Sequence, residues 1–231
     1  FLLIIDNKKL SKVLNILNRK LKRLSLELNQ DKTSIIDLES SFEYLGYVIK
    51  KDKISVRRTS IESQIKKIAY HFKHKTPVID ESDIVNRKNK KVFIEDLNEL
   101  ITGAISEDKR YGWLFYYSQI TDTKLLYILD RIVEKFFMRS DFFNRQVHPD
   151  RKSYVKAYYL MCQPDVKTNN YFHNYANYDT KSKQIEYLIA RNLIDPETAN
   201  DLNAEEIKIK FVENREKKLK NLERDVHKNK S

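Results

Sequence analysis

The spacing of apolar residues changes near residue 57, and this limits the folds that the chain can adopt. Before this point, residues 1–5, 42–49 and 54–56 favour strands, and a helix with one apolar stripe follows the first of them. After it, almost every segment has apolar residues three or four positions apart, which is typical of amphipathic helices. We therefore expect an α+β protein, with strand, helix and β-hairpin first and a mostly helical region after them.

Polar side chains that can accept backbone hydrogen bonds precede several helical segments. The stretch 76–91 is polar without periodicity and is expected to be a loop, and a helix is expected near 93–105. Residues 163–180 are expected to form a tyrosine-rich loop. The expected capping residues are Asp6 or Asn7, Thr59 with Glu62, Asp122 and Asn203.

Glycine and cysteine are rare, which excludes several classes of protein. The chain has 3 glycines in 231 residues, too few for the glycine-rich phosphate loop of most nucleotide-binding folds. The single cysteine, Cys162, excludes an internal disulfide and is expected to be a small core residue. No apolar run reaches the roughly 18 residues that span a bilayer. A cytoplasmic protein without a membrane-spanning segment is expected.

The charge is strongly positive. A formal net charge of +11 favours a polyanionic partner, which would be nucleic acid or an anionic membrane surface. A generally basic protein whose lysines only face water is the alternative.

Three short stretches follow one another near the start of the chain: FLLII at 1–5, LSLELNQDKT at 24–33 and FEYLGYVI at 42–49. Together they resemble the end of the palm domain of bacterial reverse transcriptases of the group II intron, retron and defence-associated lineage. In that family a Tyr-x-Asp-Asp turn precedes the first strand. A Leu-x-Leu-Asn-x-x-Lys-Thr motif follows, and an aromatic-x-Leu-Gly-Tyr hairpin forms the primer grip. The resemblance covers residues 1–58 closely and the helical remainder only loosely.

The resemblance implies three parts: the end of the palm at 1–58, a helical thumb-like region at 59–150 and a helical C-terminal extension at 151–231. It implies that the catalytic aspartates lie upstream of Phe1, so that these residues alone are inactive and bind no metal. The longer protein would be an RNA-directed DNA polymerase that uses Mg²⁺, an RNA template, a DNA primer and dNTP. A retron or defence-type enzyme is favoured over an intron enzyme, because Cys162 alone cannot supply a zinc-binding nuclease domain.

The resemblance also assigns roles to single residues. Lys32 is the candidate catalytic residue, as an electrostatic partner or general acid for the leaving pyrophosphate, and a plain surface position is its alternative. Gly46 would let the primer backbone approach the hairpin. The helix near Thr59 would contact duplex phosphates without reading sequence, unless its lysines merely face water. The candidate nucleic-acid-binding residues are Phe42, Tyr44, Leu45, Gly46, Tyr47, Lys66, Lys67 and Lys73.

Other interpretations remain open. The main one is a non-catalytic, basic helical module that binds RNA or DNA, and a Tyr-x-Asp-Asp turn directly before Phe1 would argue against it. The aromatic stretch 111–120 is expected to be core rather than a surface on which bases stack. The last helix is expected to be an ordinary surface helix. Self-association is its alternative, through Ile207, Phe211, Leu219 and Leu222.

Overall fold

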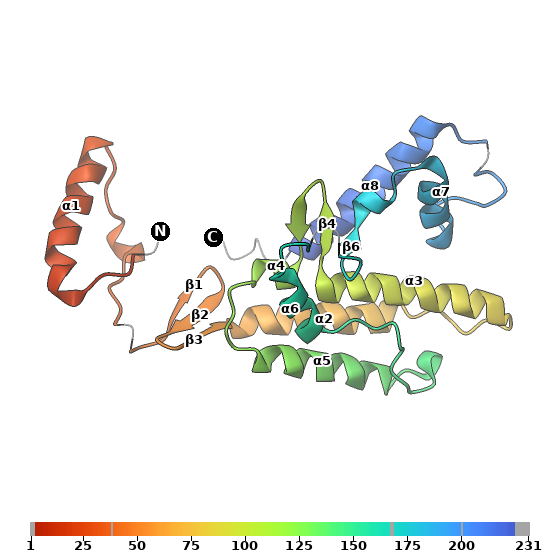
Figure 1. The fold of residues 1–231 in the computed structure, drawn as a ribbon, viewed down its shortest axis with the longest axis horizontal. Coiled ribbons are helices and arrows are strands. Elements are labelled where there is room, and N and C mark those ends of the chain that lie inside the picture. Colours follow the sequence, from red (N-terminus) through yellow and green to blue (C-terminus); the bar gives the residue numbers. More distant parts are fainter. Residues whose placement is uncertain (1–2, 38, 167–168, 200, 225–231) are drawn as a thin grey trace. The chain divides into compact units, whose positions relative to one another are not determined.

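The computed structural model describes residues 3–37, 39–166, 169–199 and 201–224. The chain forms two compact units, Phe1–Ser40 and Ser41–Ser231. The described residues combine many helices with two small three-stranded sheets, which confirms the expected α+β class (Figure 1).

The helices are η1 (Asn7–Lys9), α1 (Leu10–Arg23), η2 (Gln30–Lys32), α2 (Arg58–His74), α3 (Asp83–Thr102), α4 (Trp113–Tyr116), α5 (Lys124–Phe137), η3 (Asp141–Phe143), α6 (Tyr154–Met161), η4 (Tyr175–Asn177), α7 (Lys181–Ala190) and α8 (Ala204–Glu223). The strands are β1 (Phe42–Tyr44), β2 (Tyr47–Lys50), β3 (Lys53–Val56), β4 (Ala104–Ser106), β5 (Lys109–Tyr111) and β6 (His173–Asn174).

The first unit consists of α1 and two short 3-10 helices. Asp6 caps η1, because its carboxylate accepts a hydrogen bond from the Lys8 backbone at 3.0 Å. η1 leads directly into α1, whose own N-cap residue, Lys9, makes no side-chain cap, so the predicted cap lies one short helix earlier than α1. The apolar stripe of α1 also forms as predicted, yet none of the described residues in this unit is buried. Its helix therefore presents an apolar face that these residues do not cover.

The predicted first strand is wrong for the part of it that the structure describes. Residues 3–5 have no strand pairing, and the side chains of Leu3 and Ile4 are 51% and 73% exposed. Phe1 and Leu2 lie outside the described residues. A strand needs a neighbour to accept and donate its backbone hydrogen bonds, and the described residues provide none here.

The predicted hairpin is confirmed and extended to three strands. β1, β2 and β3 form an antiparallel sheet in that order, with Glu43 opposite Val48 and Ile49 opposite Ile54. The segment 42–49 is not one strand, because a turn at residues 45–46 divides it.

The helix α2 begins without the predicted capping box. Arg57 occupies the N-cap position with no side-chain cap, and its backbone N–H donates to Gly46 O at 2.8 Å. This link to the sheet places the N-cap two residues before the predicted one, so Thr59 lies inside the helix. Glu62 pairs instead with Arg58 at 2.8 Å.

The helix α3 is longer than predicted at its N-terminal end. Ser82 caps it by accepting a hydrogen bond from the Val85 backbone, so 83–91 is helical rather than part of a loop. The first turns of α3 are mostly polar, so the sequence there has no apolar spacing that would indicate a helix. Gly103, with φ of +79°, ends the helix before the predicted residue 105.

The main core lies where α2, α3 and α5 run side by side (Figure 1). α5 lacks the predicted cap, because the Asp122 carboxylate instead pairs with Lys53 at 2.9 Å and accepts from Ser55 at 3.0 Å. This pairing attaches the segment before α5 to strand β3. The aromatic stretch contributes Trp113 and Tyr117 to the core, as expected.

Asp130 on α5 holds the start of α6. Its carboxylate accepts backbone hydrogen bonds from Tyr154 at 2.8 Å and Val155 at 3.2 Å, and one from the Ser153 hydroxyl at 2.8 Å. Arg151 pairs with the same carboxylate at 3.2 Å. α6 itself ends before Cys162, which is exposed and not the predicted core residue.

A second core forms where α7 and α8 pack together near β4 and η4. α8 has the predicted cap at Asn203, which completes a capping box with Glu206. The face considered for self-association is occupied within the chain, since all four of its apolar residues are buried. They are Ile207, Phe211, Leu219 and Leu222. In the part of the chain that the structure describes, no helix combines the length and the apolar character needed to cross a bilayer.

The buried His71 makes stability depend on pH. Its Nε2 lies 3.1 Å from Phe93 O, and burial lowers the pKa of the imidazole below its ordinary value of 6.5. Below pH 6.5 the unfolded chain protonates His71 more readily than the folded chain does. The free energy of unfolding therefore has its full contribution from His71 above pH 6.5 and falls as the pH drops below that value. We expect a loss of up to about 1.4 kcal/mol per pH unit from this residue.

Urea unfolding between neutral and mildly acidic pH measures this effect, with His71→Gln as the comparison. The substitution removes the titrating group and keeps a side chain that can donate to Phe93 O. Its stability should therefore fall less steeply with acid, although His173, whose pKa burial also lowers, leaves a residual slope. Identical slopes for both proteins would contradict this role of His71.

Candidate nucleic-acid interface

The turn between β1 and β2 owes its glycine to packing within the chain. Leu45 and Gly46 adopt φ of +49° and +81°, a region that glycine tolerates best. A Cβ atom at Gly46 would lie 2.5 Å from the Tyr117 hydroxyl oxygen, which is a collision. The need for glycine therefore arises inside the chain, whatever approaches the turn from outside.

Tyr47 and Tyr116 fasten this sheet to the segment around α4. The Tyr47 hydroxyl donates to Tyr116 O at 2.6 Å, and the Tyr116 hydroxyl donates to Leu45 O at 3.1 Å. Burial raises the pKa of Tyr47 to about 12, so its phenol stays protonated at neutral pH. Tyr47 is thus a structural link between β2 and the residues of α4.

The five candidate residues of the hairpin differ in how far they reach solvent. Leu45 is the most accessible at 48% exposed, while Phe42, Tyr44 and Tyr47 are half-buried and Gly46 is buried. A ligand that approaches this turn would therefore meet Leu45 and the backbone first.

The helix α2 presents a basic face to solvent. Lys66, Tyr70 and Lys73 are exposed, and their spacing of four and three residues puts them on one face. The Tyr70 ring, whose residue is 59% exposed, lies 4.4 Å from the His74 ring. This face combines two ammonium groups with an accessible aromatic ring, which are groups that suit phosphates and bases.

Lys67 has a role within the chain. Its ammonium group donates to Asn221 O at 3.1 Å and Leu222 O at 3.4 Å, near the C-terminal end of α8. A cation at this end satisfies backbone carbonyls that the helix leaves without partners. The structure thus separates Lys67 from Lys66 and Lys73, which have no such contact.

Lys32 lies in the first unit, where its motif forms a local turn. Asn29 caps η2, because its side-chain oxygen accepts from the Lys32 backbone at 3.1 Å. The Thr33 hydroxyl donates to Asn29 O at 2.6 Å. The asparagine and threonine of the motif therefore fix the backbone around Lys32 and leave its side chain exposed.

A buried network of charges joins α3, α8 and the end of α7, and sequence reasoning missed it. Lys218 pairs with Asp96 at 2.6 Å and Glu99 at 3.2 Å, and Arg191 pairs with Asp96 at 3.0 Å. Burial opposes the charged form of Asp96, but Lys218 and Arg191 hold its pKa below the ordinary value. The Tyr175 hydroxyl donates to Glu99 at 2.6 Å.

Possible metal ligands were compared over the part of the chain that the structure describes. Among the described residues, no group of three or more His, Cys, Asp or Glu side chains is placed to hold a metal ion. No known protein family, curated protein or solved structure matches this chain.

Proposed function

We propose that residues 1–231 belong to an RNA-directed DNA polymerase of the bacterial reverse transcriptase type. In this proposal β1–β3 act as the primer grip, and α2 with the helices packed on it acts as the thumb that holds the template–primer duplex. The order and spacing of the three motifs in residues 1–49 carry the proposal.

The local structure of the second motif supports a role for Lys32. Asn29 and Thr33 make hydrogen bonds within the turn and so fix its backbone. The ammonium group of Lys32 is exposed to solvent on this fixed backbone. Such a group is suited to stabilise negative charge on a phosphate. We assign Lys32 to the phosphates of the incoming nucleotide.

The third motif supports a role in presenting the primer to the thumb. β3 runs directly into α2 through Arg57, so the turn at Gly46 and the basic face of α2 belong to one framework. Hydrogen bonds of Tyr47 and Tyr116 hold that turn. A rigid turn beside a cationic helix is suited to a duplex end, because the helix contacts phosphates whatever the sequence.

The uncovered apolar stripe of α1 also supports the proposal. An amphipathic helix gains stability mainly by packing its apolar face against other elements. In the proposal this face packs against palm strands that lie outside residues 1–231.

Binding of a template–primer duplex to residues 1–231 should depend on Lys66 and Lys73. We expect the Lys66→Ala/Lys73→Ala protein to bind an RNA–DNA hybrid more weakly than the parent. The slope of log affinity against log salt concentration should become shallower by about 1.8, since each lost phosphate contact removes about 0.9. Fluorescence anisotropy over a series of salt concentrations measures both quantities.

The matched control is Lys91→Ala/Lys208→Ala, which removes the same charge from two exposed positions on α3 and α8. Its affinity and salt slope should stay close to those of the parent. Equal losses in the two double variants would mean that only net charge matters, and the proposed α2 contact would fail. A loss confined to one duplex sequence would likewise contradict backbone recognition.

A further inference from the structure

The long helix α8 divides its polar side chains into two groups. On the side packed against the chain, Lys218 pairs with Asp96 and Glu99, and Arg215 pairs with Glu107 at 3.0 Å. A second set follows the helical spacing i, i+4, i+7, i+11 and i+14, and we call it the α8 row. It consists of Lys210, Asn214, Lys217, Asn221 and Arg224.

The α8 row is made only of groups that can donate hydrogen bonds, and three of them are cations. Lys210 and Lys217 are exposed and, within the described residues, have no ion pair with a carboxylate. Glu213 borders the row without interrupting it. The row therefore differs from the inner side of the helix, where Lys218 and Arg215 are already neutralised by carboxylates.

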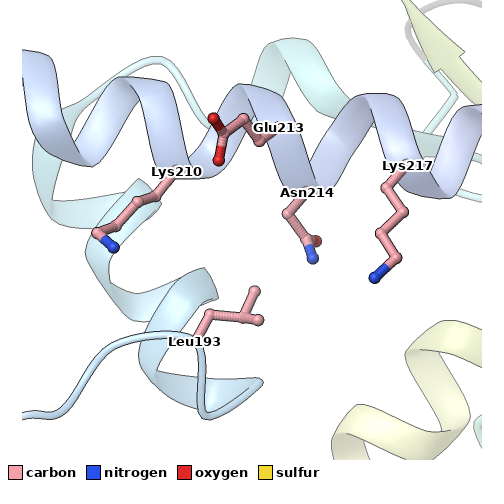
Figure 2. Close-up of a pocket in the computed structure, with 5 residues that line it drawn as sticks. All are labelled: Leu193, Lys210, Glu213, Asn214 and Lys217. Carbon is pink, nitrogen blue, oxygen red and sulfur yellow. The ribbon is translucent and has the colours of Figure 1, made fainter.

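Part of the row lines a pocket of about 250 Å³ (Figure 2). Lys210, Asn214 and Lys217 extend from α8 toward Leu193, which follows α7 and forms the apolar wall of the pocket. Leu193 is 43% exposed, and Glu213 lines the pocket as well. The lining thus holds two ammonium groups, one amide, one carboxylate and one leucine, so its net charge is positive. Such a lining suits an anionic group attached to an apolar one.

The amide in the pocket is held in place by the buried network. The Tyr187 hydroxyl donates to Asn214 Oδ1 at 3.0 Å, which leaves the amide nitrogen of Asn214 free to donate to a ligand. The Arg191 guanidinium lies 3.9 Å from the centroid of the Tyr187 ring and pairs with Glu95 and Asp96. The donor is thus oriented before any ligand arrives, which reduces the entropy lost on binding.

We propose that the α8 row and its pocket bind the sugar–phosphate backbone of single-stranded nucleic acid. From Lys210 to Arg224 the row extends about 21 Å along a straight helix, enough to follow several phosphates of an extended strand. A strand within a duplex would wind away from such a line. Leu193 would contact a sugar, while the lysines and the Asn214 amide contact phosphates.

The proposal rests on nucleic acid being the partner of this chain, but it uses a surface distinct from the Lys66 and Lys73 face. The two surfaces are connected through Lys67, which binds the backbone of α8 at Asn221. A strand that leaves the α2 face could therefore continue along α8.

The test is the affinity of residues 1–231 for a short oligouridylate and for the corresponding oligothymidylate over a series of salt concentrations. The Lys210→Ala/Lys217→Ala protein should bind both more weakly, with a salt slope shallower by about 1.4, or about 0.7 for each lysine. Asn214→Asp should also weaken binding, because it retains the acceptor for Tyr187 and places a carboxylate among the phosphates. A loss for only one oligonucleotide would identify RNA or DNA as the ligand.

The control is again Lys91→Ala/Lys208→Ala, and urea unfolding of each variant checks that the fold is retained. Parent-like binding by the α8 variants, or a loss equal to that of the control, would overturn the proposal. Competition by polyglutamate as strong as by oligouridylate would also overturn it, since the row would then bind any polyanion. Any of these outcomes would overturn only the role of the α8 row. The proposed function would be retained if duplex binding still depended on Lys66 and Lys73.

Discussion

Asp130→Ala is expected to destabilise the folded chain strongly, by about 3–5 kcal/mol. The carboxylate of Asp130 is 12% exposed and accepts hydrogen bonds from the Tyr154 and Val155 backbones. Alanine would leave the first turn of α6 without these acceptors and would leave Arg151 without one of its partners. Buried donors that lose their acceptors keep the full cost of desolvation. Urea unfolding followed by circular dichroism measures the loss.

The matched control for this prediction is Asp141→Ala. Asp141 also pairs with an arginine, Arg145 at 3.0 Å, but the two side chains are 78% and 72% exposed. An exposed pair contributes at most about 1 kcal/mol, so this variant should remain close to the parent. Equal stabilities for the Asp130 and Asp141 variants would contradict the view that Asp130 organises α6.

Lys32→Ala is expected to slow nucleotide addition by about tenfold to a thousandfold in the complete natural chain that contains residues 1–231. The proposed partner of Lys32 is a phosphate whose negative charge is greatest in the transition state. Duplex affinity should therefore stay nearly unchanged while the rate falls. Single-turnover primer extension gives the rate, and anisotropy with the same duplex gives the affinity.

Two further variants make the result specific to Lys32. Lys20→Ala removes an exposed lysine from α1 in the same unit and should leave the rate unchanged. Lys32→Arg keeps a cation on the same backbone and should recover part of the rate. An unchanged rate in Lys32→Ala would make Lys32 an ordinary surface lysine, and parallel losses of rate and duplex binding would indicate a damaged fold.

Elements with a clear apolar stripe or strand alternation could be predicted from the sequence. The stripes of α1, α2 and α5 and the strands β2 and β3 depend on neighbours within a few positions, so local spacing is enough to identify them. The capping box of α8 at Asn203 is likewise a local pattern. The core position of the aromatic stretch 111–120 is also predictable, because most of its residues are too apolar to remain in water.

Features set by distant contacts could not be predicted in this way. Thr59 and Asp122 both have side chains suited to capping, but the link from Arg57 to Gly46 and the pairing of Asp122 with Lys53 decide where α2 and α5 begin. Tertiary contacts of this kind override local preference.

The candidate site shows the same limit. The motif spacing identified Gly46, and the resemblance of the helix near Thr59 to a thumb helix identified Lys67. Neither revealed the collision of a Gly46 Cβ with Tyr117 or the hydrogen bond from Lys67 to the end of α8. The buried charge network has partners 95 and 122 positions apart, which local patterns do not connect. Each of these contacts joins elements that only the folded chain brings together.

The most direct test of the central claim is RNA-templated primer extension by the complete natural chain that contains residues 1–231. We predict DNA products that require the RNA template, the primer and dNTP, and that decrease strongly in Lys32→Ala. Tight, salt-sensitive binding of the duplex without any extension would contradict the claim, and the chain would then be the non-catalytic nucleic-acid-binding module considered as the alternative.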